Sequence, residues 1–573
     1  MTINLQRTLN ERVETSLHKF VEGEPPAVVV PAGRPEFGDY QANGVMGAAK
    51  RIRTNPRELA TDVLADVDLG DMVESIDIAG PGFLNIRLKP SFLSEQLTKT
   101  TLLETVAEPK RIVVDYSSPN LAKEMHVGHL RSTIIGDAVA RTLELVGHDV
   151  IRQNHIGDWG TAFGRLLAYL DEVGDGFAQN AELRNIEKLY VEASSRFESD
   201  SAFADRSRAM VLALQSHDAD AMAKWEHFMA LAQQHMSEIY AKLDVSLRPE
   251  HTRGESSYNA DIVPLIEDLR KQNDVLVESD GALCIFMPQF KNKDGEIQPM
   301  IVQKSDGGYL YHTTDLAALR YRFDSLHADR VLYFTDARQT LHFEMLFAAS
   351  RLANLVEPSV TLEHHPFGKV LGKDGKPLKS RSGDNIVLRD LLDQAVNRAS
   401  SLIRKKNPGL GKTQHEEVAR AVAIGAVKYA DLSKNRLHDY TFDWDEMLAF
   451  DGNTAPYLQY AYARISGIFE KGNIDSSECT EPPQLDMEVE RQLAVHLLRF
   501  QEVIEQVTAD AKPHYLCTYL YELTVRFMRF YEQCPILSEE GSIRAGRLTL
   551  CSRVAATLEI GLGALGIRVL ARM

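Results

Sequence analysis

The chain has 573 residues, of which 44% are hydrophobic. A length of this order predicts about three or four domains with ordinary apolar cores. The formal net charge of −17 argues against a protein that coats nucleic acid without specificity, because the general field repels phosphates. A specific nucleic-acid partner would need local basic clusters.

The cysteines and the apolar segments indicate the cellular compartment of the protein. Five scattered cysteines form no Cys-x-x-Cys pair, which favours a reducing environment and no structural zinc. The first twenty residues lack the apolar core of a signal peptide, and no later stretch is long enough to span a bilayer. We therefore expect a cytoplasmic protein without a membrane partner.

Residues 1–95 predict a small α+β domain. A helical start and a helix at about 45–53 precede two apolar strands, at 75–79 and 83–88. The run Gly80-Pro81-Gly82 between these strands is typical of a tight turn.

A strand, a polar loop and a long helix follow, in the pattern of a βαβ unit. Residues 111–116 form an apolar strand, and residues 117–129 form a loop that contains two histidines. From Leu130 onward, apolar residues recur close to the helical period until Gly147 supplies a stop. A second apolar strand begins at Val150. Ligands of such units bind at the carboxyl ends of the strands.

The end of this loop has the residue types of a phosphate site. His126 and His129 are three positions apart and share one face of a helix start, where N–H groups and the helix dipole attract anions. Each imidazole can donate to a phosphate oxygen, and Gly128 lets a nucleotide approach the backbone. The alternative is a helix start without a ligand, but the strand-loop-helix context favours a nucleoside triphosphate site.

The rest of the chain divides into two regions. Residues 108–392 show the strand-helix alternation of a parallel sheet, with an inserted subdomain at about 175–305. Residues 393–573 are almost wholly helical in pattern, with one of the helices expected over residues 487–509. The predicted fold class is α/β: a Rossmann-like parallel-sheet catalytic domain with an insertion, a small α+β N-terminal domain and an all-α C-terminal domain.

Several blocks of sequence carry a resemblance to a known family. Residues 115–135, with Ser-Ser-Pro-Asn and His-x-Gly-His, resemble the signature of bacterial-type class I arginyl-tRNA synthetases. Further blocks follow in the family's order, at residues 154–161, 336–343, 367–376, 379–383 and 452–464. The resemblance covers nearly the whole chain, and so many ordered blocks make coincidence negligible.

The resemblance implies a ligase reaction in two steps. Arginine and ATP give arginyl-adenylate and pyrophosphate, and the arginyl group then passes to the 2′-hydroxyl of the 3′-terminal adenosine of tRNA(Arg), releasing AMP. Both steps move negative charge between oxygens, so positioning and fixed donors matter more than a nucleophilic side chain. ATP is expected with Mg²⁺ that binds phosphates and water, without a protein-built metal site.

The resemblance assigns phosphate contacts to His126 and His129 and room for adenosine to Gly128. The second phosphate loop, residues 379–383, reads Lys-Ser-Arg-Ser-Gly, so the second lysine of the common Lys-Met-Ser-Lys-Ser pattern is missing.

Lys123 stands where family members with a degenerate loop place a compensating lysine, whose ammonium could neutralise phosphate charge. Lys379 and Arg381 complete the predicted catalytic set. The alternative for Lys123 and Arg381 is a surface lysine and a flexible polar loop.

The resemblance also assigns an arginine pocket, because a guanidinium demands carboxylates and planar acceptors. Asp115 and Asn120 would hold the ammonium and carboxylate end, and Tyr311 and Asp315 would recognise the guanidinium. Gln339 would add a polar contact. The alternatives left open are a helix cap for Asp315 and a surface amide for Gln339.

Two further positions are assigned to ATP. His342 is expected near the ribose or the amino acid, with a satisfied structural histidine as an equal alternative. Backbone groups near Val370 could recognise adenine.

For tRNA, the resemblance implies that the N-terminal domain binds the D-loop and that the C-terminal helices bind the anticodon. Tyr457, Tyr460 and Tyr462 are candidates for stacking on splayed bases. The family commonly needs bound tRNA before it activates arginine, and it is usually monomeric.

Other classes of protein fit less well. A noncatalytic tRNA-binding paralogue would be expected to lose His126, His129 or the pocket carboxylates, and all are present. An enzyme that makes small-molecule adenylates would lack the helical C-terminal domain. A class I synthetase for glutamate or cysteine is the nearest rival, and the acidic pocket and the missing zinc-type cysteines argue against both.

Overall fold

The computed structural model describes residues 4–99, 101–174, 183–272, 274–378 and 386–573, with the backbone alone for 183–189 and 215. The chain forms two compact units, Val106–Leu448 and the combination of Met1–Thr105 with Ala449–Met573. Among the described residues, no helix is long and apolar enough to cross a membrane.

The unit of residues 106–448 is built on a four-stranded parallel sheet of order β11-β10-β5-β6. The strands are β5 (Arg111–Asp115), β6 (Asp149–Gln153), β10 (Arg330–Tyr333) and β11 (Thr361–His364). Because β6 and β10 lie on opposite sides of β5, the strand order reverses between β5 and β10, and ligands bind at such a switch point. The predicted parallel-sheet fold is confirmed.

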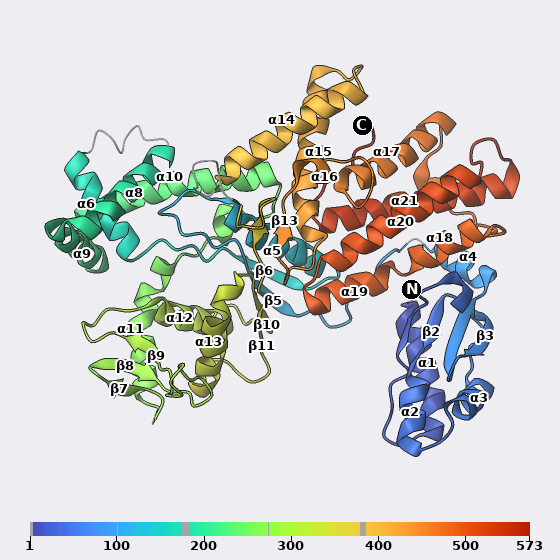
Figure 1. The fold of residues 1–573 in the computed structure, drawn as a ribbon, viewed down its shortest axis with the longest axis horizontal. Helices are drawn as coiled ribbons and strands as arrows, with labels where there is room; N and C mark the ends of the chain where they lie inside the picture. The colour runs from blue at the N-terminus through green and yellow to red at the C-terminus, as the bar shows by residue number, and fades with distance from the viewer. Residues whose placement is uncertain (1–3, 100, 175–182, 273, 379–385) are drawn as a thin grey trace. The chain divides into compact units, whose positions relative to one another are not determined.

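Helix α5 (Val127–Leu145) connects β5 to β6, and Gly147, at φ 92°, follows its end as predicted. In the described part of the chain between β6 and β10, the first four helices pack against one another (Figure 1). They are α6 (Thr161–Val173), α8 (Leu183–Ser199), α9 (Ser201–Gln215) and α10 (Ala219–Leu243). The rings of Phe163 and Phe228, whose centroids are 5.8 Å apart, join α6 to α10.

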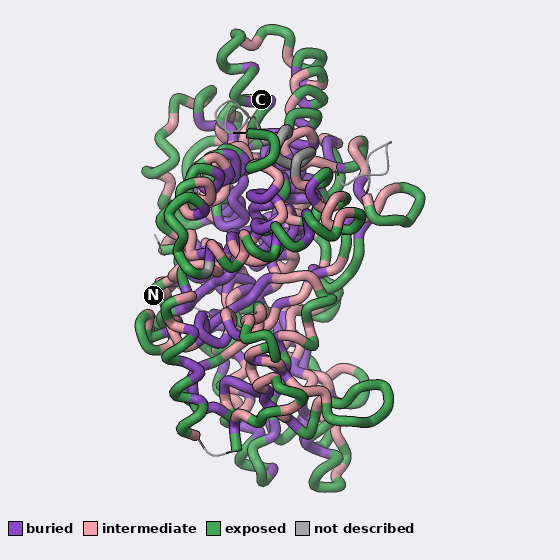
Figure 2. Tube along the Cα trace, turned by 90° about the vertical axis from the view of Figure 1, so that its left-hand side faces the viewer, coloured by how far each residue is buried: buried purple, intermediate pink, exposed green. Residues whose placement is uncertain are grey.

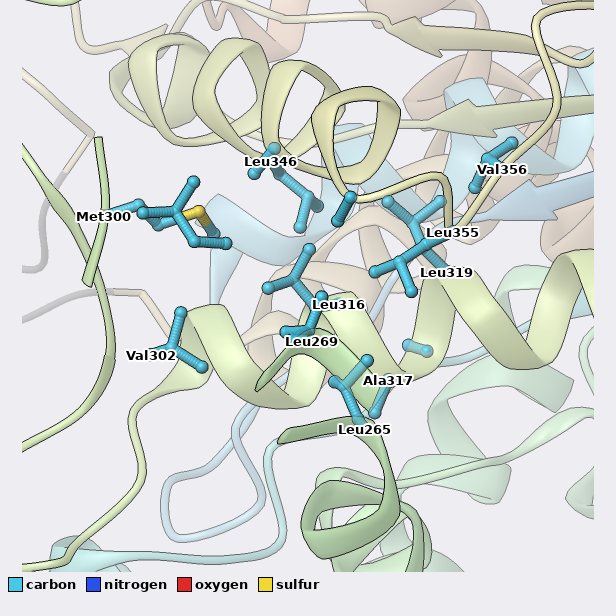
Figure 3. Packing of buried hydrophobic residues seen from close by; sticks show 14 of the residues in the cluster. Leu265, Leu269, Met300, Val302, Leu316, Ala317, Leu319, Leu346, Leu355 and Val356 are labelled. Atoms are coloured by element: carbon cyan, nitrogen blue, oxygen red, sulfur yellow. The ribbon is translucent and has the colours of Figure 1, made fainter. Parts of the chain in front are cut away.

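A second group of elements before and after β10 shares one apolar cluster. It comprises α11 (Asn259–Arg270), a small antiparallel sheet, α12 (Tyr311–Asp324) and α13 (Thr340–Leu352). The sheet consists of β7 (Val277–Ser279), β8 (Ala282–Ile285) and β9 (Met300–Gln303). Figure 3 shows Leu316 of α12 between Leu269 of α11, Met300 of β9 and Leu346 of α13. This packing fixes α12, whose first turns carry two of the predicted pocket residues.

The same unit ends in short strands and helices. Strands β12 (Val370–Leu371) and β13 (Tyr440–Thr441) pair in parallel. Helices α14 (Leu388–Lys406) and α15 (Lys412–Leu432) pack closely against each other, and α16 (Trp444–Met447) follows. Arg131 of α5 and Asp431 of α15 form a buried ion pair, with Nε to Oδ2 at 3.0 Å.

The other unit begins with an antiparallel sheet of order β1-β2-β4-β3. Its strands are β1 (Val29–Pro31), β2 (Tyr40–Ala42), β3 (Val73–Ala79) and β4 (Phe83–Leu88). Its helices are α1 (Leu5–Phe20), α2 (Gly44–Ile52), α3 (Pro56–Asp66) and α4 (Pro90–Thr98). The predicted tight turn at Gly80-Pro81-Gly82 joins β3 to β4, where Ala79 pairs with Phe83.

The rest of this unit is helical. Its helices are α17 (Ala455–Gly472), α18 (Glu488–Leu498), α19 (Phe500–Asp510), α20 (His514–Gln533) and α21 (Gly541–Ala564). A single helix is expected from the sequence over residues 487–509, but the backbone leaves helical geometry at Arg499, with φ −83° and ψ 0°. Figure 2 shows buried residues gathered inside the packed parts of the chain and exposed residues in many outer turns and loops.

Buried polar contacts join the N-terminal sheet to α18 and α19. The Tyr40 hydroxyl donates to Glu502 Oε1 at 2.6 Å, and the Gln6 backbone N–H donates to the same oxygen at 2.8 Å. Arg491 pairs with Asp39, and both side chains are 6% exposed. Burial raises the pKa of Glu502 to about 7.

This raised pKa predicts that the unit loses stability as the pH rises. Between about 4.5 and about 7 the folded state holds a proton on Glu502 that the unfolded chain has released, so the free energy of unfolding falls, by up to about 3 kcal/mol. We expect the thermal unfolding midpoint of Glu502→Gln to decline less over this range than that of the wild type. Glu532→Gln, which changes an exposed carboxylate on α20 of the same unit, is the control and keeps the wild-type slope.

Candidate active site

The loop between β5 and α5 has a strained backbone that neighbouring elements hold in place. Ser117 and Ser118 have φ of 68° and 43°, which is unusual outside glycine. The Ser117 hydroxyl lies 2.7 Å from the Tyr240 hydroxyl of α10. The Ser118 N–H donates to Asn154 Oδ1 at 2.9 Å. The loop is therefore fixed before any ligand binds.

The two histidines of the predicted phosphate site cap the start of α5. The Gly128 N–H donates to Nδ1 of His126 at 3.0 Å, and the His126 N–H donates to Nδ1 of His129 at 3.1 Å. Because both Nδ1 atoms accept hydrogen bonds, each neutral ring carries its proton on Nε2. The ring centroids are 4.1 Å apart. The helix start thus offers two Nε2–H donors side by side.

The environment keeps these rings neutral. Burial lowers the pKa of His129 to about 3, with a smaller contribution from His126. Burial also lowers the pKa of His126, and the charge of Lys123 adds to this effect. A Cβ atom on residue 128 would lie 2.7 Å from the His126 ring, so glycine is required for the cap itself. Lys123 is exposed, and its Nζ lies 5.2 Å from the centre of the Tyr190 ring.

The backbone just before α5 pairs with the backbone just before α14. The Val127 N–H donates to Ile386 O, and the Leu388 N–H donates to Met125 O, both at 2.9 Å. Residues 386–388, which follow the predicted second phosphate loop in the sequence, therefore contact the segment that carries the predicted phosphate site. The predicted residues Lys379 and Arg381 lie outside the described residues.

Asp115 ends β5, but its carboxylate is engaged inside the protein. Arg322 of α12 donates to Oδ2, and the Ser118 hydroxyl donates to Oδ1 at 2.7 Å. Arg322 is 1% exposed and also donates to Gln153 Oε1 at 2.7 Å. Asn120 is exposed, and its side-chain oxygen accepts from the Ala122 N–H at 2.9 Å. Sequence reasoning missed Arg322, which lies within α12 without a motif.

Asp315 lies at the centre of a polar cluster on the first turns of α12. Nε2 of His342 donates to its Oδ2 at 2.7 Å, and Nε2 of His155 lies 3.5 Å from its Oδ1. These partners lower the pKa of Asp315, although its burial acts in the opposite direction. The Tyr311 ring is 55% exposed and lies 5.0 Å from the His342 ring, centre to centre. Tyr311, Asp315 and His342 therefore come together, so His342 lies beside the predicted guanidinium pocket.

Glu255 is a second carboxylate of this cluster that sequence reasoning missed. It begins a short 3-10 turn, Glu255–Tyr258. Burial raises its pKa to about 8, with further contributions from Asp315 and Asp158. A half-buried acid that feels the charge of other acids is a good site for a cation. The only sequence signal is an acidic residue in a Gly-Glu-Ser-Ser turn, which is equally typical of surface loops.

The last two predicted positions lie at opposite extremes of burial. Gln339 is exposed and directly precedes α13. Val370 is 7% exposed in β12, and its carbonyl accepts from the Leu378 N–H at 3.0 Å.

A parallel sheet with imidazole donors at a helix start beside its switch point agrees with the class I aminoacyl-tRNA synthetase that the sequence predicts. Residues 92–444 match the family model described as tRNA synthetases class I (R), catalytic domain. Residues 7–88 match the arginyl tRNA synthetase N-terminal domain, and residues 458–573 match the DALR anticodon binding domain. The chain belongs to the arginyl-tRNA synthetase family.

Relatives agree over the full length. The arginine–tRNA ligases of Hahella chejuensis and Marinomonas sp. are 51% and 50% identical to this chain, and each alignment covers all of both chains. The crystal structure of arginyl-tRNA synthetase from Plasmodium falciparum is 28% identical with a TM-score of 0.87 and covers all of both chains. The Thermus thermophilus arginyl-tRNA synthetase, at 24% identity and a TM-score of 0.85, covers 99% of this chain and all of its own and shares the fold.

Proposed function

We propose that this chain is an arginine–tRNA ligase. An arginine carboxylate oxygen attacks the α-phosphorus of ATP, the bond to the β-phosphate oxygen breaks, and pyrophosphate leaves. The 2′-hydroxyl of the terminal adenosine of tRNA(Arg) then attacks the carbonyl of the adenylate, and AMP leaves. Mg²⁺ accompanies ATP through phosphate oxygens and water.

The observation that carries this proposal is the pair of Nε2–H donors at the start of α5. The donors are preorganised, so stabilising charge that develops on the phosphates needs no reorganisation. The helix N-terminus adds its own field. His126 and His129 are the proposed phosphate contacts, and Gly128 leaves room for the nucleotide. Lys379 and Arg381 stay proposed as the second phosphate-binding element.

We propose that Asp315 and Glu255 select arginine through its guanidinium, with Tyr311 against its face. Two acids side by side oppose each other's ionisation, and a cation relieves that repulsion. Asp115 and Asn120 stay proposed for the ammonium and carboxylate end, since a carboxylate has acceptor positions beyond those that Arg322 and Ser118 use.

The remaining pocket positions are proposed for arginine and for ATP. Gln339 is exposed before α13 and is proposed for a polar contact with arginine. His342 and the Val370 backbone stay proposed for ATP. His342 contacts Asp315, which supports a place where arginine and ATP meet.

Lys123 is proposed to neutralise phosphate charge, because its charge contributes to the lowered pKa of the neighbouring His126. We expect Lys123→Ala to reduce adenylate formation by about tenfold or more with little change in tRNA affinity, as for a charge used in the transition state. Single-turnover adenylate formation and tRNA filter binding measure the two quantities. A loss of tRNA affinity with unchanged activation would place this lysine on the tRNA surface.

For tRNA we propose that residues 1–95 bind the D-loop and that the C-terminal helices bind the anticodon. Tyr460 is 38% exposed, and the Arg464 guanidinium lies 4.9 Å from its ring centre and 5.0 Å from that of Tyr531. Such a surface can stack on unpaired bases. Tyr462 donates to Glu559 at 3.3 Å, and Tyr457 contacts Tyr521, so these two are engaged within the protein. We also propose that the ligase works as a monomer in the cytoplasm and that bound tRNA promotes its activation of arginine.

The test is ATP–pyrophosphate exchange and tRNA aminoacylation with each of the twenty amino acids. We expect both activities with arginine alone, and exchange that rises sharply when tRNA is added. Activity with another amino acid in place of arginine would overturn the proposal.

A further inference from the structure

Glu124 is a buried acid two positions before His126, and none of the roles above uses it. Its side chain is 2% exposed. A carboxylate at this depth is retained only where partners compensate its charge. The elements that supply those partners show what this position does.

The partners come from two helices that are distant in sequence. Nε2 of His235 on α10 lies 3.3 Å from Glu124 Oε1, and His235 is 7% exposed. Arg389, in the first turn of α14, donates to Nδ1 of His235 and lies 3.3 Å from Glu238 Oε2 on α10. Because Nδ1 accepts from Arg389, a neutral ring carries its proton on Nε2, the nitrogen that lies 3.3 Å from Glu124 Oε1. Arg389, His235 and Glu124 thus form one line of contacts, the line Arg389–His235–Glu124.

A backbone contact runs beside this line of side chains. His126 bridges Val387 in antiparallel fashion, and two hydrogen bonds of 2.9 Å flank that bridge. Glu124 therefore directly precedes residues 125–127, which pair with residues 386–388 just before Arg389. Side chains and backbone together clamp residues 124–127 between α10 and α14.

We propose that Glu124 is a positioning residue for adenylate formation, which it supports through His235 and Arg389; this inference rests on the proposed function. By fixing the backbone before α5, the line sets where the Nε2–H donors of His126 and His129 point. Small displacements of such donors cost rate, because they must match the charge that develops in the transition state. The line also connects α10 of the insertion to the phosphate site.

The experiment measures single-turnover adenylate formation, arginine and ATP affinities, and thermal unfolding on the full chain with tRNA. We expect Glu124→Gln, which keeps the shape and removes the charge, to reduce the rate about tenfold or more. Affinity for arginine should stay within about twofold, and the unfolding midpoint should stay close to that of the wild type. Arg389→Ala should show the same pattern, and Arg389→Lys should recover part of the rate because it restores a cation.

Two further variants separate positioning from packing. Lys242→Gln breaks the exposed ion pair between α10 and α14, in which Nζ lies 2.5 Å from Asp393, and it should leave the rate unchanged. The double variant Glu124→Gln with Arg389→Ala should lose no more than the worse single variant, because both act on one line.

The outcomes are distinct. A Glu124→Gln rate within about twofold of the wild type, or an equal loss in Lys242→Gln, overturns the inference while the proposed function stands. A wild type without arginine-dependent exchange overturns the proposed function and the inference with it.

Discussion

Replacement of His129 by asparagine is expected to reduce arginyl-adenylate formation by about 10²-fold or more, which corresponds to about 3 kcal/mol in the transition state. The reason lies in the two nitrogens of the ring. Nδ1 accepts the His126 N–H at 3.1 Å and so serves the helix cap, whereas Nε2–H is the donor available to phosphate. Asparagine places its oxygen where Nδ1 lies and therefore keeps the cap while it removes the donor.

Glutamine at the same position is the matched control. Its amide nitrogen reaches the place of Nε2, so this variant keeps a donor and loses the cap, which costs about 1 kcal/mol of stability. We expect His129→Gln to unfold at a lower temperature and yet to activate arginine faster than His129→Asn. Single-turnover kinetics and thermal unfolding measure the two effects. If the asparagine variant retains full turnover, His129 serves the cap alone.

The pH dependence gives a second check on this role. Burial holds the pKa of His129 at about 3, so its ring stays neutral throughout the neutral range. The rate of adenylate formation at saturating substrates should therefore show no titration of His129 between about pH 6 and pH 8.

The geometry of the proposed phosphate site could be predicted from sequence because its determinants are local. Strand, loop, cap and helix follow one another within residues 111–147, and the two histidines are fixed by hydrogen bonds to backbone groups at most three positions away. A local sequence motif therefore predicts this geometry by itself. The fold class was predictable for a similar reason, since each strand-helix alternation is visible by itself.

The pocket partners could not be found in the same way because they are tertiary. Glu255 and Asp315 are 60 positions apart, and only the packing of α11 and β9 against α12 brings their segments together. The Arg322 side chain of α12 contacts Asp115 of β5 and the Tyr333 ring of β10, and it engages a carboxylate that sequence reasoning assigned to substrate alone. The break of the predicted helix at Arg499 also reflects tertiary packing, since α18 packs against α4 whereas α19 packs against α1.

Arginine affinity is expected to rise with pH up to about 8, and this dependence should vanish in Glu255→Gln. The pKa of Glu255 is raised to about 8 by burial and by the nearby charges of Asp315 and Asp158. A bound guanidinium favours the ionised carboxylate, so arginine binding releases the proton that Glu255 holds below this pH. Each unit of pH below 8 then costs up to tenfold in affinity, or about 50-fold in all between pH 6 and pH 8.

The Glu255→Gln variant should also bind arginine more weakly than the wild type at about pH 8. Removal of one charged hydrogen-bond partner of the guanidinium costs about 1.5–3 kcal/mol, or about 10- to 150-fold in the dissociation constant. Isothermal titration in buffers of different ionisation enthalpy measures both the affinity and the released proton. Glu250→Gln removes an exposed carboxylate just before the same turn and is the control for general electrostatics; it should keep the wild-type slope.

His155 and His342 also contact Asp315. The difference between wild type and Glu255→Gln isolates the contribution of Glu255, since both chains keep the histidines. Citrulline, which has the shape of arginine without its charge, sharpens the result: the preference for arginine over citrulline should shrink in Glu255→Gln, because the lost interaction is with the guanidinium charge. If Glu255→Gln keeps both the preference for arginine over citrulline and the wild-type dependence of arginine affinity on pH, Glu255 does not bind the guanidinium and Asp315 is the acid that does.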